Sequence, residues 1–182
     1  MAHHLSAARL ALLVHLQRES FAYFLHTVNP ANGLVRDKTA ADAPASIAAV
    51  GMALTVYPIG VERGFMTRAH ASDLTLAALR FFATSDQGTA ADATGYKGFY
   101  YHFLDMDTGR RAWNCELSSI DTALLMAGVL TAAAYFGGAP QLRFTSTVNY
   151  LDYFDFTYIL HRNTRSDDQL IIPVEGVKQP VK

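Results

Sequence analysis

Two carboxylates stand close together just before the most apolar stretch of the chain. Glu116 and Asp121 are separated by Leu117-Ser118-Ser119-Ile120, and the aromatic segment Phe99-Tyr100-Tyr101-His102-Phe103 precedes them. Paired carboxyl groups can act as general acid and base, and aromatic rings can stack on the faces of sugars. The pattern therefore suggests carbohydrate binding or hydrolysis.

Each acid also has an ordinary structural explanation. A negative charge such as Glu116 near a helix N-terminus gains about 0.3–1 kcal/mol from the helix dipole. Asp121 follows Ser118 by three residues, a spacing close to a capping box, so it could orient the backbone instead of touching substrate. Asp37 follows the turn Asn32-Gly33, in a loop where most acids are simply solvated. We predict that Asp37 and Glu116 oppose each other as a catalytic pair if their two loops share one rim.

Several aromatic side chains between residues 96 and 113 could line a sugar cleft. Alternate residues of a strand face opposite sides, so about half of these rings are expected in the core. His102 lies among them, where a histidine is more often a hydrogen-bonded core residue than an acid or a ligand. The residues predicted to contact substrate from this segment are Phe99, Tyr101, His102 and Trp113.

Composition and motifs exclude several other classes of function. The formal net charge is -1 and no block of like charge is present, which argues against a nucleic-acid partner. Cys115 is the only cysteine, so no internal disulfide can form. The histidines show no metal-binding spacing, and neither a phosphate-binding glycine loop nor a nucleophilic serine elbow is present. We predict no metal and no cofactor.

Hydrophobic periodicity predicts a mostly helical chain. The expected helices span residues 6–27, 47–58, 68–84, 119–136 and 140–156. Ser46 and Thr67 are the expected caps of the second and third helices, and Pro58 is expected to end the second. The long connection 85–117 is expected to contain an irregular β-hairpin between residues 99–103 and 110–113.

The apolar pattern of these helices predicts how they are layered. The first, third and fifth are apolar on one side, whereas the second and fourth are apolar all round, as inner helices of a two-layer ring would be. Five helices are too few to close such a ring. The apolar run 122–136 has fifteen residues, fewer than the roughly 18 needed to span a membrane, so a buried helix is expected. The N-terminus lacks the pattern of a signal peptide, and the sequence does not indicate a compartment.

The chain resembles the bacterial glucoamylase-like family, which includes endo-β-1,2-glucanases and a domain of cyclic β-1,2-glucan synthases. The resemblance covers roughly residues 15–157, in the family's order. The matching segments are Glu19-Ser20-Phe21-x-Tyr23-Phe24, Gly33-Leu34-Val35-x-Asp37, Ser46-Ile47-Ala48-Ala49-Val50-Gly51, Tyr57-Pro58-Ile59-Gly60-Val61-Glu62-Arg63-Gly64, Gly98-Phe99-Tyr100-Tyr101-His102-Phe103 and Glu116-Leu117-Ser118-Ser119-Ile120-Asp121-Thr122.

The resemblance implies an all-α fold, here a partial (α/α)6 toroid of about five helices with a small β-hairpin insertion. It also implies hydrolysis of bacterial β-glucan, with β-1,2-glucan as the foremost substrate. Glu116 and Asp37 would be the catalytic acids, with Asp121 and His102 as neighbours that contact substrate. Which acid is the proton donor stays open. Family members are often periplasmic or part of a membrane-bound synthase.

Family domains are more than twice as long as this chain. Residues 1–160 are therefore expected to form the N-terminal part of such a domain, and residues 161–182 a tail without resemblance to the family. The sequence leaves two hypotheses: a glycoside hydrolase lineage with Glu116 and Asp37 across an open cleft, or a non-catalytic remnant that binds glycan or self-associates. Contiguous apolar surface on an open half-ring would favour the second.

Overall fold

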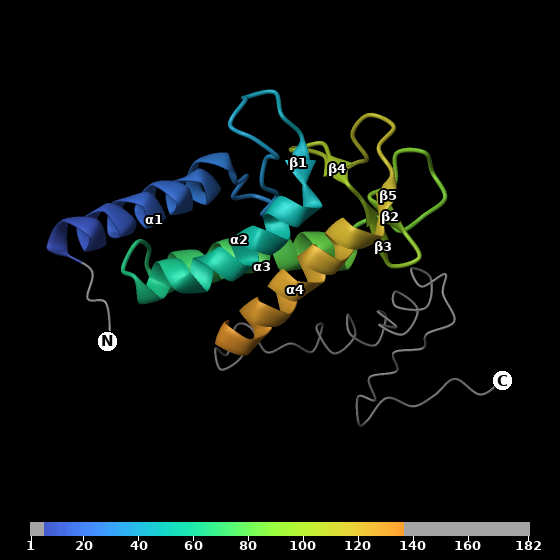
Figure 1. The fold of residues 1–182 in the computed structure, drawn as a ribbon. Helices are drawn as coiled ribbons and strands as arrows, with labels where there is room; N and C mark the ends of the chain where they lie inside the picture. The colour runs from blue at the N-terminus through green and yellow to red at the C-terminus, as the bar shows by residue number, and fades with distance from the viewer. Residues whose placement is uncertain (1–5, 137–182) are drawn as a thin grey trace, which may run out of the picture.

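The structure, a computed structural model, describes residues 6–136, and this part of the chain is mostly helical with small antiparallel sheets (Figure 1). Its four helices are α1 (Ala7–Thr27), α2 (Ile47–Glu62), α3 (Arg68–Thr84) and α4 (Ser119–Phe136). Four of the five predicted helices are thus present. The predicted helix at 140–156 and the tail at 161–182 lie outside the described residues.

Helices α2 and α4 form the centre of the fold. Both begin beside the strands and run in the same direction (Figure 1), and they touch where Gly51 faces α4 and Gly128 faces α2. A Cβ atom added at Gly128 would collide with the carbonyl oxygen of Gly51, and one added at Gly51 would collide with that of Leu124. Glycine is therefore required at this crossing because the two backbones are in direct contact.

Helix α2 continues past the proline that was expected to end it. Pro58 lies inside the helix, which ends at Glu62, so the predicted end was wrong. Proline removes one helical hydrogen bond, but Tyr57, Pro58 and Gly60 are all buried. The last turn of α2 is buried against α1, where Gly60 lies under the ring of Phe21. This contact with another helix stabilises the turn, and the local sequence pattern does not reveal it.

Helix α3 runs antiparallel to the central pair and joins their C-terminal ends. The Arg68 guanidinium donates to the Tyr135 carbonyl at 3.0 Å, and the Tyr135 hydroxyl is 2.6 Å from Glu62 Oε1. At the opposite end of α3, Phe82 packs edge-on against Tyr100, with ring centroids 4.9 Å apart. These contacts tie α3 to both ends of the core.

Helix α1 packs on the core only through its C-terminal half. Phe21 is buried, but Leu10, Leu13 and Leu16 are each at least half exposed, although the apolar spacing of α1 predicted one continuous buried stripe. The periodic pattern identified the helix correctly. The pattern did not reveal that the first turns of α1 extend past the other helices of the described chain (Figure 1).

Five short strands gather at the end of the molecule where α2 and α4 begin (Figure 1). β1 (Ala45–Ser46) pairs with β4 (Phe103–Leu104), and β3 (Phe99–Tyr101) lies between β2 (Gly95–Tyr96) and β5 (Leu117–Ser118). All of these pairs are antiparallel.

The predicted hairpin between residues 99–103 and 110–113 is only partly correct. Residues 103–105 do bond to 110–112, through the Leu104–Arg111 bridge and the flanking backbone hydrogen bonds. However, β3 pairs with β2 and with β5 instead of with 110–113. The aromatic strand is therefore held by the segment that leads into α4, a long-range pairing that turn chemistry alone does not specify.

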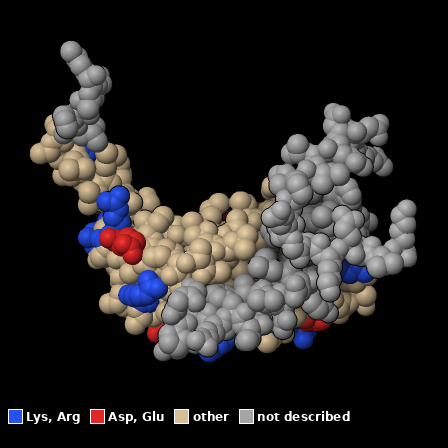
Figure 2. Space-filling model, turned by 90° about the horizontal axis from the view of Figure 1, so that it is seen from below, with Lys and Arg blue, Asp and Glu red and all other residues tan. Residues whose placement is uncertain are grey.

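The two central helices each expose some apolar side chains. The exposed residues are Met52 and Ile59 on α2 and Ile120, Leu124 and Leu130 on α4. Seen from below, the described part of the chain shows a broad uncharged area, with the charged side chains toward its edges (Figure 2). By length and composition α4 could also cross a membrane, but its buried residues pack into the core, and a membrane span is not established.

Candidate active site

Four extended segments lie side by side at the strand-bearing end of the molecule. The Asp37 N–H donates to the Pro44 carbonyl at 2.9 Å, and Ser46 pairs with Phe103. The His102 N–H in turn donates to the Glu116 carbonyl at 3.1 Å. These pairings link the segment of Asp37 to that of Glu116 through two intervening segments. Both acids therefore lie at the same end of the fold.

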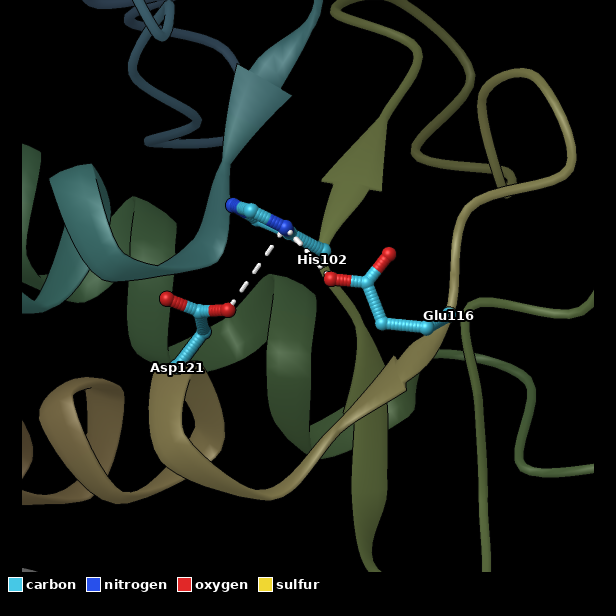
Figure 3. A group of neighbouring side chains, drawn as sticks. All are labelled: His102, Glu116 and Asp121. Atoms are coloured by element: carbon cyan, nitrogen blue, oxygen red, sulfur yellow. Dashed lines mark hydrogen bonds and ion pairs between the residues drawn. The ribbon is translucent and has the colours of Figure 1, made fainter.

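Glu116 is in contact with His102, and His102 also faces Asp121. The His102 Nδ1 atom is 2.8 Å from Glu116 Oε1 and 3.6 Å from Asp121 Oδ2 (Figure 3). The three side chains come from the link between β3 and β4, the residue before β5, and the first turn of α4. The Glu116 side chain is 64% exposed and that of Asp121 only 13%, so the cluster has an inner and an outer carboxylate.

Asp121 is fixed by the cap of α4. The Ser118 hydroxyl donates to Asp121 Oδ2 at 2.5 Å, and the Asp121 N–H donates back to Ser118 Oγ at 3.2 Å. Ser118 thus caps the Asp121 N–H as in a capping box, but the Asp121 carboxylate accepts from the Ser118 hydroxyl and not from the Ser118 backbone N–H. One turn later the Thr122 hydroxyl is held by the Ser118 carbonyl and accepts the Tyr100 N–H. Asp121 therefore makes the contact with Ser118 that its spacing predicted, and the same side chain also faces His102.

The surroundings of Glu116 favour its ionised form. Its own backbone N–H, followed by the His102 side chain, lowers the pKa of the Glu116 carboxyl below its ordinary value, and the charge of Arg111 acts in the same direction. An ionised carboxylate only accepts hydrogen bonds, so His102 must carry a hydrogen on Nδ1 to bond it. Glu116 is thus held as a carboxylate that accepts the His102 hydrogen bond.

Asp37 is exposed, and the segment that carries it is anchored by Tyr23. The Tyr23 hydroxyl on α1 donates to the Arg36 carbonyl at 2.5 Å. Burial and, to a lesser degree, the nearby Asp37 charge raise the pKa of the Tyr23 hydroxyl. Helix α1 therefore positions the loop of Asp37, whereas the strands position Glu116.

The predicted substrate-contacting rings are in different environments. Trp113 is 68% exposed and lies edge-on to Phe103, which stacks on His102 with centroids 3.8 Å apart. Tyr101 and Phe99 are half-buried, and the Arg111 guanidinium lies 4.1 Å from the centre of the Tyr101 ring. Trp113 is therefore the ring of this group best placed to meet a ligand from solvent.

Two residues that support the site, Tyr23 and Arg111, were not predicted to do so from the sequence. Tyr23 and Arg111 act through the segments they hold, because the Arg111 guanidinium is bonded to the Cys115 carbonyl next to Glu116. Ser118 also supports the site, and its spacing to Asp121 did indicate this from the sequence. The convergence of His102 with Asp121, 19 positions later in the sequence, has no short-motif signature.

No family model matches the chain. At the level of sequence, it is 27% identical over 131 residues to an exo-β-1,2-glucooligosaccharide sophorohydrolase from Parabacteroides distasonis, which covers 69% of the chain and 17% of the relative.

Comparison with solved structures indicates the same group of proteins. A β-1,2-glucanase from Parabacteroides distasonis matches with a TM-score of 0.66 and 24% identity, over 78% of this chain and 20% of that one. A candidate glucoamylase from Bacteroides uniformis matches with a TM-score of 0.59 and 27% identity, over 75% of this chain and 32% of that one. The chain thus spans about a third or less of these proteins. It is a partial match to the bacterial glucoamylase-like and β-1,2-glucanase family of structures.

Proposed function

We propose that this chain is a glycoside hydrolase-like domain, part of an (α/α)6 toroid, that acts on bacterial β-glucan, with β-1,2-glucan as the preferred substrate. The observation that carries the proposal is the Glu116–His102–Asp121 cluster beside the exposed Trp113, at the same end of the fold as Asp37. The relatives that act on β-1,2-linked glucans give the substrate class.

Glu116 is assigned the role of base. It takes a proton from a water molecule that attacks the anomeric carbon, while the Asp37 carboxylic acid gives a proton to the departing glycosidic oxygen. This mechanism requires a carboxyl separation of about 6.5–9.5 Å, which leaves room for the water between the two side chains. His102 holds Glu116 through Nδ1, with Asp121 behind it, and the sugar contacts come from Trp113, Tyr101 and Phe99.

The experiment is hydrolysis of β-1,2-glucan by the full chain, with β-1,3-glucan as the comparison substrate. Release of reducing sugar from β-1,2-glucan but not from β-1,3-glucan supports the proposal. Glu116→Gln and Asp37→Asn should each lower the rate by about 10²–10⁴-fold, the usual contribution of general acid–base groups.

The matched control is Glu19→Gln. Glu19 is as exposed as Glu116, at 64%, and also lies beside a histidine, His15, at 4.0 Å. Its replacement should leave the rate unchanged. Equal losses in the Glu19 and Glu116 variants, or hydrolysis that survives Glu116→Gln, would show that the site is assigned wrongly.

A second candidate is a non-catalytic remnant that binds glycan or self-associates. The exposed apolar residues of α2 and α4, Met52 and Leu124 among them, favour association with another copy. Sedimentation separates the two functions: an oligomer that releases no sugar supports the remnant, and a monomer that releases sugar supports the hydrolase.

A further inference from the structure

Three potential metal ligands converge at the strand-bearing end of the molecule. His102 Nδ1, one Glu116 oxygen and one Asp121 oxygen all lie within 4.8 Å of one another, and Figure 3 shows the three side chains pointing toward a common space. Imidazole nitrogen and carboxylate oxygen are ordinary ligands of divalent transition metals, Zn²⁺ above all. The set therefore has the right chemistry for such an ion.

The distances fit the size of a zinc ion. Tetrahedral Zn²⁺ with bonds near 2.1 Å places its ligand atoms about 3.4 Å apart. The His102–Glu116 and His102–Asp121 distances, 2.8 and 3.6 Å, lie on either side of that value, and the Glu116 and Asp121 oxygens are at most 4.8 Å apart. The exposed Glu116 side chain would have to rotate for all three atoms to surround one ion, and the same exposure leaves a coordination position open to water.

The two inner ligands are already oriented by other groups. The Ser118 hydroxyl holds Asp121 Oδ2, and the ring of Phe103 stacks on His102 with an interplanar angle of 15°. Such outer contacts strengthen metal sites because the ligands lose little freedom on binding. The nearby Arg111 guanidinium is bonded to the Cys115 carbonyl and stacked on Tyr101. The two carboxylates of the cluster supply two negative charges to balance the ion.

We propose that His102, Glu116 and Asp121 bind a divalent transition-metal ion, best Zn²⁺, and that the bound ion inhibits the site. Binding displaces the proton from His102 Nδ1, so that this nitrogen gives its lone pair to the metal. The metal also takes the Glu116 oxygen that would accept a proton from water. The inhibition, unlike the binding, rests on the proposed hydrolytic function.

The test of binding is titration of the full chain with Co²⁺, followed by its visible absorption, and with Zn²⁺ by calorimetry. Because His3 and His4 at the N-terminus could chelate a metal independently, all variants are made in a His3→Gln/His4→Gln background. We expect one site, with at least a tenfold loss of affinity in both His102→Gln and Asp121→Asn.

The matched control for binding is His15→Gln. His15 lies beside Glu19, which is as exposed as Glu116, but among the described residues Glu19 is its only acidic partner. The metal affinity of the His15→Gln variant should equal that of the background chain. Circular dichroism identifies any variant that fails to fold, and Asp121→Asn retains the shape of the side chain. Affinity weaker than millimolar, or unchanged in His102→Gln, would overturn the site.

Inhibition is measured separately from binding. Zn²⁺ should suppress hydrolysis over the same concentration range in which it binds, and full activity at saturating Zn²⁺ would overturn the inhibitory role. Metal binding by a chain that hydrolyses no glucan would support the metal site while contradicting the proposed hydrolase. Hydrolysis without metal binding would support the proposed hydrolase and contradict the metal site.

Discussion

His102 and Glu116 are joined by a 2.8 Å hydrogen bond between side chains 14 positions apart in the sequence. The bond exists because β3 and β5 pair in register, with Tyr101 opposite Leu117, which brings the next residue on each segment together. The strand pairing thus places His102 where, together with the backbone N–H of Glu116, it lowers the Glu116 pKa, and several measurable consequences follow from this and the neighbouring contacts.

Replacing His102 with alanine should raise the pKa of Glu116. The Glu116 pKa is lowered in the folded chain, so the associated stability is present above the unfolded-state pKa and is lost as the pH falls through the folded value. Without the His102 donor, Glu116 should protonate at higher pH. NMR titration of the Glu116 carboxyl carbon measures this, and the acidic limb of the activity profile should move the same way. An unchanged titration would mean that the hydrogen bond does not form in solution.

Ser118→Ala should destabilise the chain by about 1 kcal/mol, because it removes the cap of α4. It should also release Asp121 from its 2.5 Å hydrogen bond. Thermal or urea unfolding gives the stability. Ser118→Thr, which keeps a hydroxyl, should recover most of the loss, whereas Ile120→Ala, at an exposed position of the same first turn, provides the control.

Gly128→Ala should destabilise the chain by about 1–3 kcal/mol, since the added methyl group has no space between the α2 and α4 backbones. The melting temperature reports the effect. Ala134 lies on an exposed part of the same helix, so Ala134→Leu adds more volume and should change stability little. Similar melting temperatures for Gly128→Ala and the unmodified chain would contradict the backbone contact.

Tyr23→Phe should cost about 1 kcal/mol through loss of the hydrogen bond to the Arg36 carbonyl. If Asp37 is catalytic, the same variant should lower kcat more than it raises KM, because the loop that carries the acid becomes less well positioned. Tyr96→Phe, in the β2 strand away from this loop, is the comparison. A variant with normal kcat would show that Tyr23 serves stability alone.

The helices of the described chain could be predicted from sequence because their signals are local. Ser46 and Thr67 cap α2 and α3 as expected, each accepting the N–H three residues later. The all-round apolar pattern also identified α2 and α4 as the central pair. The continuation of α2 through Pro58 could not be predicted, because it depends on burial against another helix.

The candidate site was predictable as a set of residues, but not as a geometry. The acids Glu116 and Asp121 were recognisable from their types and spacing. Their connection through His102 depends on the pairing of β3 with β5, and the position of Asp37 depends on Tyr23 of α1. Both are tertiary contacts between distant segments, and no periodic pattern encodes them. The catalytic roles of Glu116 and Asp37 stay predictions.

The glycine crossing of α2 and α4 has a mechanical consequence. Helices that meet through long side chains can slide by exchanging rotamers, but at Gly51 and Gly128 there are no side chains to exchange. The direct backbone contact therefore leaves the two helices little freedom to shift relative to each other at this crossing, and it lies on the same pair of helices whose N-terminal ends carry the strands.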